Sequence, residues 1–156
     1  MPKKEIACLG CAIQSGEVET PGGVIASSEH FEAQQDYEIP IPGFVILTSK
    51  RHLVSFDEFT KDEQQDFIKL LCRVRKGMRE ALGVNTVYFV QEEDTQHHFH
   101  VWLFPRYGWM TEEFGRKINS VRPIMEYARK HMKTADNLVK VDQATQKLRQ
   151  FLAQEE

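Results

Sequence analysis

The sequence predicts an α+β fold, in which short strands and one long helix are followed by a group of C-terminal helices. Three observations lead to this class. Short apolar or alternating runs, bounded by Gly and Pro, fill much of the first 50 residues and return before residue 107. A helical hydrophobic period follows residue 60 and again residue 110. No Gly/Ser-rich linker separates these parts, so a single domain over residues 1–156 is expected.

Short strands are expected in the first half of the chain. Two of them, Val18–Glu19 and Val24–Ser27, would be joined by a Pro-Gly-Gly turn, and a third would span His30–Gln35. Phe44–Thr48 is continuously apolar, which is typical of a strand in the centre of a sheet. A further strand at Thr86–Gln91 precedes the histidine-rich segment.

The long helix has local signals at both ends. Thr60 and Glu63 have the spacing of a capping box, in which each side chain accepts from the other residue's backbone N–H. Gly83 can adopt the left-handed conformation that ends many helices. Between them lies an apolar stripe at helical spacing, formed by Phe67, Leu71, Val74, Met78 and Leu82.

Three helices are expected in the C-terminal part. The first would span 111–119, and Ser120 would cap the second, which tolerates Pro123 in its first turn. Asp136 would cap the third, whose apolar stripe consists of Leu138, Val141, Leu148 and Phe151.

The segment 98–106 (HFHVWLFPR) is the most informative part of the chain. Its aromatic and β-branched residues predict a strand. Because side chains alternate along a strand, His98, His100 and Trp102 share one face, and the intervening apolar residues are buried on the other. Two imidazoles about 7 Å apart can serve one site in two roles. The alternative is a pair of half-exposed histidines at a sheet edge.

Composition limits the classes of function. The 41% hydrophobic and 28% charged content is ordinary for a globular protein. A net charge of −3 argues against general affinity for nucleic acid or for an anionic membrane. The N-terminal residues lack the apolar run of a signal peptide, and three cysteines without an export signal favour a cytoplasmic chain with reduced thiols.

Cys8 and Cys11 have the Cys-X-X-Cys spacing with which two thiolates can bind one zinc ion. A tetrahedral site needs two more ligands, which the six histidines of the chain could supply. A redox pair and two unconnected thiols are the alternatives. The redox reading is weaker because the motif does not lie between a strand and a helix of a βαβ unit.

Taken together, these motifs resemble the histidine triad (HIT) family of nucleotide hydrolases and transferases. Residues 98–106 match its His-φ-His-φ-His-φ-φ motif (φ apolar) and the Pro-Arg that often follows, with Trp102 at the third histidine. Residues 8–17 resemble the family's Cys-X-X-Cys opening, and residues 42–52 resemble its central strand and basic-basic-histidine turn. The resemblance covers about residues 5–107 and leaves the helices at about 111–154 outside it.

The resemblance implies an antiparallel sheet of about five strands with the long helix packed against it. It also implies a structural zinc ion held by Cys8, Cys11, His52 and His98. Four protein ligands leave no open position for water, so the metal would orient the histidine strand and would not hydrolyse substrate. Iron could occupy the same ligands.

His100 corresponds to the family nucleophile, which attacks the α-phosphate of a nucleotide or dinucleoside polyphosphate and forms a nucleotidyl-histidine. A neutral imidazole, with an ordinary pKa of about 6.5, is a competent nucleophile at cytosolic pH. The expected partner is therefore a small-molecule nucleotide. The alternative is a zinc-stabilised nucleotide-binding or signalling module with little turnover.

Further substrate contacts are implied by position. Gln91 and Thr95 stand where family members contact phosphate, and Asp36 stands where they contact ribose. Arg106 follows the motif strand and could clamp phosphate. Each also has a simpler reading, as a polar strand end, a turn residue or a packing residue. An apolar long helix and an exposed edge strand are compatible with a homodimer.

Trp102 departs from the family pattern. An indole N–H can donate a hydrogen bond but cannot surrender a proton at a useful rate. Acidic leaving groups such as pyrophosphate or a nucleotide are therefore favoured over an amine, or Trp102 simply fills the pocket mouth. The acidic turn 92–94 could repel phosphates, hold a bridging divalent cation or be solvated surface.

Overall fold

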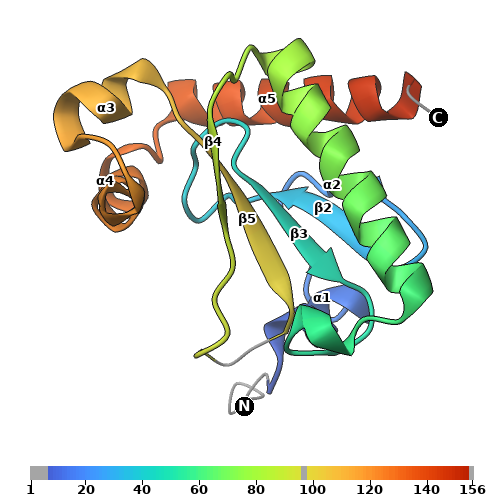
Figure 1. Cartoon of the computed structure of the whole chain (residues 1–156). Coiled ribbons are helices and arrows are strands. Elements are labelled where there is room, and N and C mark those ends of the chain that lie inside the picture. Colours follow the sequence, from blue (N-terminus) through green and yellow to red (C-terminus); the bar gives the residue numbers. More distant parts are fainter. Residues whose placement is uncertain (1–6, 96–97, 155–156) are drawn as a thin grey trace, which may run out of the picture.

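The computed structural model describes residues 7–95 and 98–154. The N-terminal residues 1–6, which argued against a signal peptide, lie outside it, as do the outermost residues of the predicted domain. Within the described ranges the chain forms one antiparallel five-stranded sheet in the order β1-β2-β3-β5-β4 (Figure 1). This confirms the predicted α+β class. The strands are β1 (Val24–Ser27), β2 (Phe31–Gln35), β3 (Val45–Ser49), β4 (Val87–Val90) and β5 (His100–Pro105).

Strand β3 lies in the middle of the sheet, as its continuous apolar sequence predicts. It pairs with β5 so that Thr48 is opposite His100 and Ile46 is opposite Trp102. Helix α2 (Lys61–Leu82) packs on the other face of these strands, where Val101 and Leu103 are buried. Strand alternation therefore separates a core face from the face that carries His100 and Trp102.

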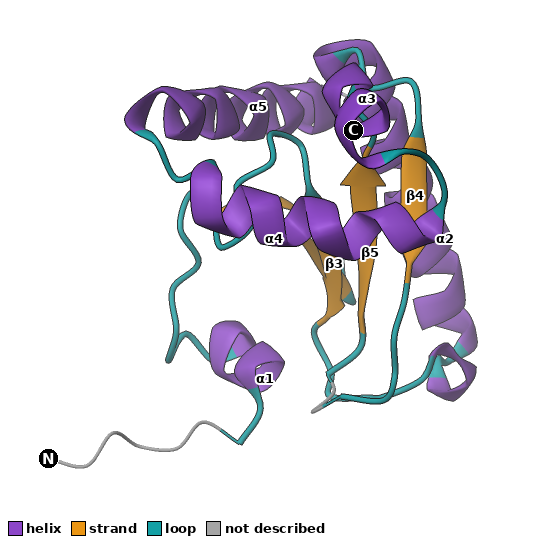
Figure 2. Ribbon diagram, turned by 90° about the vertical axis from the view of Figure 1, so that its left-hand side faces the viewer, coloured by secondary structure: helices purple, strands orange, loops and turns teal. Residues whose placement is uncertain are grey.

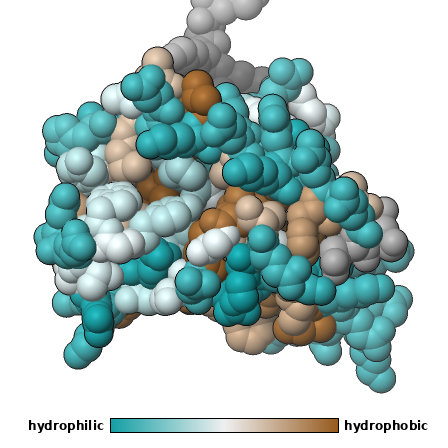
Figure 3. All heavy atoms as spheres, turned by 90° about the horizontal axis from the view of Figure 1, so that it is seen from above, coloured by the Kyte–Doolittle hydropathy of each residue, from teal (hydrophilic) through white to brown (hydrophobic). Residues whose placement is uncertain are grey.

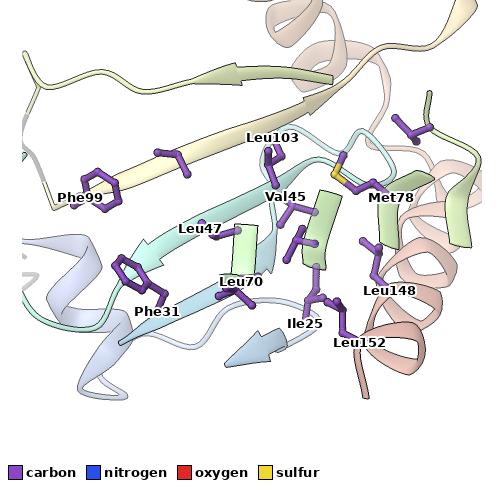
Figure 4. Close-up of a cluster of buried hydrophobic side chains, with 14 of the residues drawn as sticks. Ile25, Phe31, Val45, Leu47, Leu70, Met78, Phe99, Leu103, Leu148 and Leu152 are labelled. Carbon is purple, nitrogen blue, oxygen red and sulfur yellow. The ribbon is translucent and has the colours of Figure 1, made fainter. Parts of the chain in front are cut away.

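Helix α2 begins and ends as predicted. Thr60 and Glu63 form the capping box, and Gly83 ends the helix with a φ of 69°. A core cluster joins α2 to the sheet and to the C-terminal helix α5 (Ala135–Gln154) (Figure 4). Its labelled members include Leu47 and Leu103 from the sheet, Leu70 and Met78 from α2, and Leu148 and Leu152 from α5.

Helix α5 contacts both α2 and the edge strand β1. Its buried residues recur at helical spacing, at Val141, Ala144, Thr145, Leu148 and Leu152. Polar side chains cover much of the face seen from above, with apolar atoms visible between them (Figure 3). This is the pattern of an amphipathic surface helix.

Helix α4 (Val121–His131) crosses the sheet on the face opposite α2 (Figure 2). There it buries Ile124 and Ala128 in a second core cluster that also contains Phe44 and Phe104 and is contacted by Trp102. The shorter helical elements are α1 (Leu9–Gln14), η1 (Phe56–Glu58), α3 (Gly108–Phe114) and η2 (Ile118–Ser120). Among the described residues, no helix is long and apolar enough to span a membrane.

Several predicted boundaries are wrong. Val18–Glu19 is not a strand and instead follows the turn after α1. The helix expected at 111–119 is α3, which runs from Gly108 to Phe114. It ends there because the next residue, Gly115, has a φ of 79°, which is not helical. Residue Ser120 precedes α4 but makes no side-chain cap, because its hydroxyl accepts from Arg106 and donates to the Lys117 carbonyl.

The start of α5 was also misplaced. The hydroxyl oxygen of Thr134, two residues before Asp136, accepts from the Asn137 backbone N–H at 3.2 Å. Thr134 therefore caps this helix in the way predicted for Asp136.

Candidate metal cluster and nucleotide cavity

Four side chains from three separate segments meet at one end of the sheet. They are Cys8 and Cys11 at the start of α1, His52 in the loop after β3, and His98 just before β5. One ligand atom from each lies within 4.8 Å of all the others. The structure thus brings together all four residues that the resemblance implies as metal ligands.

The spacing of these atoms fits a tetrahedral metal site. The Sγ atoms of Cys8 and Cys11 lie 3.4 Å and 3.2 Å from Nδ1 of His52, and both lie 3.4 Å from Nδ1 of His98. Zinc bonds of about 2.3 Å to sulfur and 2.0 Å to nitrogen would put these atoms about 3.5 Å apart. Two thiolates and two imidazoles are the donor set of a closed structural zinc site.

Backbone groups hold two of the ligands in the orientation that metal binding needs. Nε2 of His98 donates to the Ser49 carbonyl at 2.6 Å, which leaves the lone pair on Nδ1, the atom that faces the thiols. The Cys11 backbone N–H donates to Sγ of Cys8 at 3.3 Å. Burial, with a further contribution from Cys8, raises the pKa of the Cys11 thiol, and a bound cation would oppose that shift.

Gly10, between the two cysteines, is required by the position of His98. A Cβ atom at Gly10 would lie 2.4 Å from Cγ of the His98 ring. Any larger side chain would therefore push α1 away from the histidine strand. Sequence reasoning missed this role, although a Gly inside a Cys-X-X-Cys segment is a local sign of close approach.

His100 uses its ring differently from His98. Its Nδ1 donates to the His98 carbonyl at 2.8 Å, so the lone pair lies on Nε2. The ring is half-buried, and it lines a cavity of about 590 Å³. The two histidines therefore present opposite ring nitrogens to two different surroundings.

This cavity is bounded by α1, the segment 18–21 and the open part of the sheet. Apolar side chains form much of it, among them Leu9, Ile13, Val18, Ile46 and Trp102. Its carboxylates come from Glu19, Asp36 and Glu38, and no described lining residue is Lys or Arg. A second cavity, of about 460 Å³, lies between α2, α5 and the loop at 41–42, and none of the predicted site residues lines it.

Trp102 forms the wall of the cavity beside His100, with the two ring centroids 6.5 Å apart. Its indole packs edge-on against Phe44 at 6.1 Å, which fixes the ring. The guanidinium of Arg122, from α4, lies 5.2 Å from the Trp102 ring centroid. The same guanidinium bonds to both carboxylate oxygens of Glu92, at 2.6 Å and 2.7 Å.

Asp36 lies at the cavity wall, where the family resemblance places a ribose contact. Its Oδ1 accepts from the Ile39 backbone N–H at 3.0 Å, so one oxygen also closes a turn. Burial raises the pKa of this carboxyl, and backbone hydrogen bonds from Ile39 and Glu38 act in the opposite direction.

Gln91, Thr95 and Arg106 do not line the cavity. The Gln91 amide donates to a Glu93 carboxylate oxygen at 3.2 Å, and Thr95 is exposed. A phosphate contact by these two residues stays a prediction.

Arg106 is buried beyond the far end of β5. It donates to the Ser120 hydroxyl at 2.9 Å and the Gly115 carbonyl at 2.7 Å. Arg106 therefore ties the C-terminal helices to the sheet, and a phosphate contact by it stays a prediction.

The contact between Glu92 and Arg122 was also missed by sequence reasoning. Strand β4 ends at Val90, two residues before Glu92, so strand alternation does not place the Glu92 side chain. No local pattern pointed to Arg122, which is 30 residues away in a region outside the resemblance.

Solved structures share this fold. A zinc-bound histidine triad family protein from Mycobacterium smegmatis superimposes with a TM-score of 0.66 at 19% identity, over 95% of this chain and 94% of that one. A HIT family protein from Bacillus anthracis gives a TM-score of 0.59 at 19% identity, over 87% and 92% of the two chains. At these identities the likeness concerns the fold.

Sequence relatives give the family. No protein-family model matches the chain. The Bacillus subtilis protein called "Protein hit" is 26% identical over 106 residues, which are 65% of this chain and 72% of that protein. An uncharacterized HIT-like protein of Methanocaldococcus jannaschii is 32% identical over 107 residues, covering 64% of this chain and 79% of the relative. With the histidine strand, the fold and these relatives in agreement, the chain belongs to the histidine triad family.

Proposed function

We propose that this protein is a nucleotide hydrolase or nucleotidyltransferase that acts on the α-phosphate of a nucleotide or dinucleoside polyphosphate through His100. The orientation of the His100 imidazole carries the proposal. Its Nδ1 proton is committed to the His98 carbonyl, so Nε2 has the lone pair that a nucleophile needs, at the wall of a cavity of about 590 Å³. That volume is in the range of small-ligand sites.

The reaction proceeds in two displacements. Nε2 of His100 bonds to the α-phosphorus while the bond from phosphorus to the leaving oxygen breaks, and the leaving group departs as a phosphate-terminated anion. Water or another acceptor hydroxyl then attacks the phosphorus. The phosphorus–nitrogen bond breaks with its electron pair returning to Nε2, the acceptor releases its proton to solvent, and the imidazole, which kept its Nδ1 proton, is regenerated.

The cavity wall supports the choice of substrate. Trp102 beside His100 supplies an apolar wall and no transferable proton, so an acidic leaving group such as a nucleotide or pyrophosphate suits the site best. The Asp36 carboxylate, on the same wall, has one oxygen in a turn and can accept from a ribose hydroxyl with the other.

Cys8, Cys11, His52 and His98 would hold a structural zinc ion. The zinc-bound relative from Mycobacterium smegmatis supports this assignment. With four protein ligands, zinc contributes rigidity and no catalytic water. The chain's own residues do the rest: His98 orients its neighbour through its carbonyl, and His100 meets the substrate.

One observation favours a second function, a nucleotide-binding module with little turnover. The third motif position, where the family has a histidine, holds Trp102, which is fixed by Phe44 and covered by Arg122. Such a site could bind a nucleotide without assisting its cleavage.

Phosphorus NMR on a panel of adenine and guanine dinucleoside polyphosphates separates the two functions. Time-dependent formation of nucleoside monophosphate, lost in His100→Ala with zinc content and folding retained, supports the enzyme. Saturable nucleotide binding without any new phosphorus resonance would support the second function, a binding module without turnover. Absence of both binding and turnover would contradict the whole proposal.

A further inference from the structure

The cavity beside His100 has an unfavourable charge for a nucleotide. Its described lining contains carboxylates and no Lys or Arg, whereas a cation near the phosphoryl oxygens would strengthen phosphate binding. Cations that flank the central strand and the histidine motif are engaged elsewhere. Lys50 donates to the Ser28 carbonyl, Arg51 pairs with Glu63, and Arg106 bonds to Ser120.

Three cations contact residues of the cavity wall: Lys133 and Arg129 face Glu38, and Arg122 faces Trp102, the wall residue beside His100. The Arg122 guanidinium lies over the Trp102 ring, and both of its bonds to Glu92 use the Nη2 atom. Arginine has five N–H donors, so Nη1 and Nε retain donors for another acceptor. The Arg122 side chain is 62% exposed and can therefore change position without disturbing the core.

Glu92 lies beside the cavity wall through Arg122, which binds its carboxylate and lies over the Trp102 ring. An unpaired carboxylate there would repel a nucleotide. Paired with Arg122, the carboxylate is neutralised and the guanidinium is held above Trp102. Glu92 thus occupies, for Arg122, the place that a phosphate group would take.

We infer that Arg122 is a phosphate-binding residue of this site and that the phosphate of an incoming nucleotide displaces Glu92 from it. The inference rests on the proposed function and deepens it. It assigns a positive charge for this site to helix α4, which lies outside the sequence motifs that resemble the histidine triad family. The preferred ligand is a nucleotide with two or more phosphates, because a phosphate next to the one attacked by His100 can bind the guanidinium over Trp102.

The magnitudes favour this exchange. An ion pair as exposed as Glu92–Arg122 changes an equilibrium by about five-fold at most. Charge-assisted hydrogen bonds from a guanidinium to phosphate change affinity by roughly ten- to hundred-fold. A phosphate group therefore competes successfully with the carboxylate, while the Trp102 ring keeps the guanidinium over the site.

Titration calorimetry with ADP on the wild-type protein and on variants at Arg122, Glu92 and Lys130 tests the inference. Arg122→Ala should weaken ADP binding by about ten-fold or more, because the phosphate loses its cation. Glu92→Gln should tighten it by up to about five-fold, because the competing charge is gone. Lys130→Ala removes one positive charge from the exposed surface of the same helix and should leave the affinity unchanged. Adenosine, which has no phosphate, should bind wild type and Arg122→Ala equally.

The opposite signs of the two effects are decisive. If the Glu92–Arg122 pair only supports the fold, both variants weaken ADP alike, and the inference is overturned. Equal affinity of wild type and Arg122→Ala overturns it as well. If wild type binds neither ADP nor adenosine, the proposed function itself fails. Arg122→Lys, which keeps the charge but loses the planar donors, should give an intermediate affinity.

Discussion

His98 and His100 are two residues apart and both line the same cavity, yet a different ring nitrogen of each is bonded to a backbone carbonyl, and His98 belongs to the metal cluster while His100 does not. His98 is 5% exposed, gives its Nε2 proton to the Ser49 carbonyl and turns Nδ1 to two thiols. His100 is half-buried, gives its Nδ1 proton to the His98 carbonyl and lines a cavity. One backbone carbonyl in each case decides which nitrogen keeps the lone pair.

The comparison shows that a backbone acceptor can set the role of a histidine. Both side chains are imidazoles with the same intrinsic chemistry, and the carbonyl that each bonds determines whether Nδ1 or Nε2 can bind a cation or attack phosphorus. The strand supplies the spacing, and the neighbouring loops supply the acceptors.

The largest effect is expected from His100→Ala. Removal of the nucleophile should lower turnover of a dinucleoside polyphosphate by about 10³-fold or more. Zinc content by metal analysis and the Tm should stay at wild-type values, because the ring is not among the four cluster residues. Normal turnover by the variant would show that His100 is not the nucleophile.

His98→Ala should abolish the metal-binding role of the first histidine. With a ligand lost, the chain should no longer retain zinc, and the Tm should fall by about 10 °C. Metal analysis and a thermal melt measure the two effects. A chelator should lower the Tm of wild type in the same way and should add nothing to the variant. Full zinc retention in the variant would contradict the assigned ligand set.

Gly10→Ala tests the close approach on which the cluster depends. The new methyl group would meet the His98 ring, and such overpacking costs about 1–3 kcal/mol. The Tm and the zinc affinity should both fall. Gly108→Ala is the matched control, because nothing lies within 4 Å of its added Cβ and its φ is not positive. An equal effect of the two changes would show that the His98 contact is unimportant.

Asp36→Asn should give the smallest effect, in the pH dependence of stability. Burial raises the pKa of Asp36 above the ordinary 3.8, so the folded chain binds this proton more tightly than the unfolded chain. The stabilisation is full below pH 3.8 and is lost as the pH rises through the folded-state pKa.

Asn keeps the oxygen that closes the turn and has no proton to lose. Between pH 4 and 7, the free energy of unfolding of the variant should therefore change less than that of wild type. Urea titrations across this range measure the difference. If the free energies of unfolding of wild type and Asp36→Asn change in parallel with pH, burial does not raise the pKa of Asp36.

Local signals explain which parts of the fold were predictable. Thr60, Glu63 and Gly83 define both ends of α2 through hydrogen bonds and backbone conformation within one helical turn, so their sequence spacing was sufficient. At the start of α5, Thr134 and Asp136 are both capping residues, and sequence alone could not choose between them. At Gly115, a helix-ending residue was overlooked inside a polar stretch.

The residues of the site also fall into those that the sequence could predict and those that it could not. Alternation along the histidine strand, together with the family resemblance, sufficed for the four cluster residues and the face of His100. A phosphate contact by Arg106 stays a prediction, and its position next to the motif gave no sign of the partners that bury it, Ser120 and Gly115. The contact of Arg122 with Glu92 depends on how α4 crosses the sheet, which only the packed structure reveals.

Helix α1 has six residues and buries only Ala12 among them, and outside the cluster its Gln14 amide donates to Glu32 of β2 at 3.1 Å. Its Leu9 and Ile13 form part of the cavity wall. Because α1 carries both cluster residues and wall residues, any factor by which zinc changes the affinity of a cavity ligand must equal the factor by which that ligand changes the affinity of zinc.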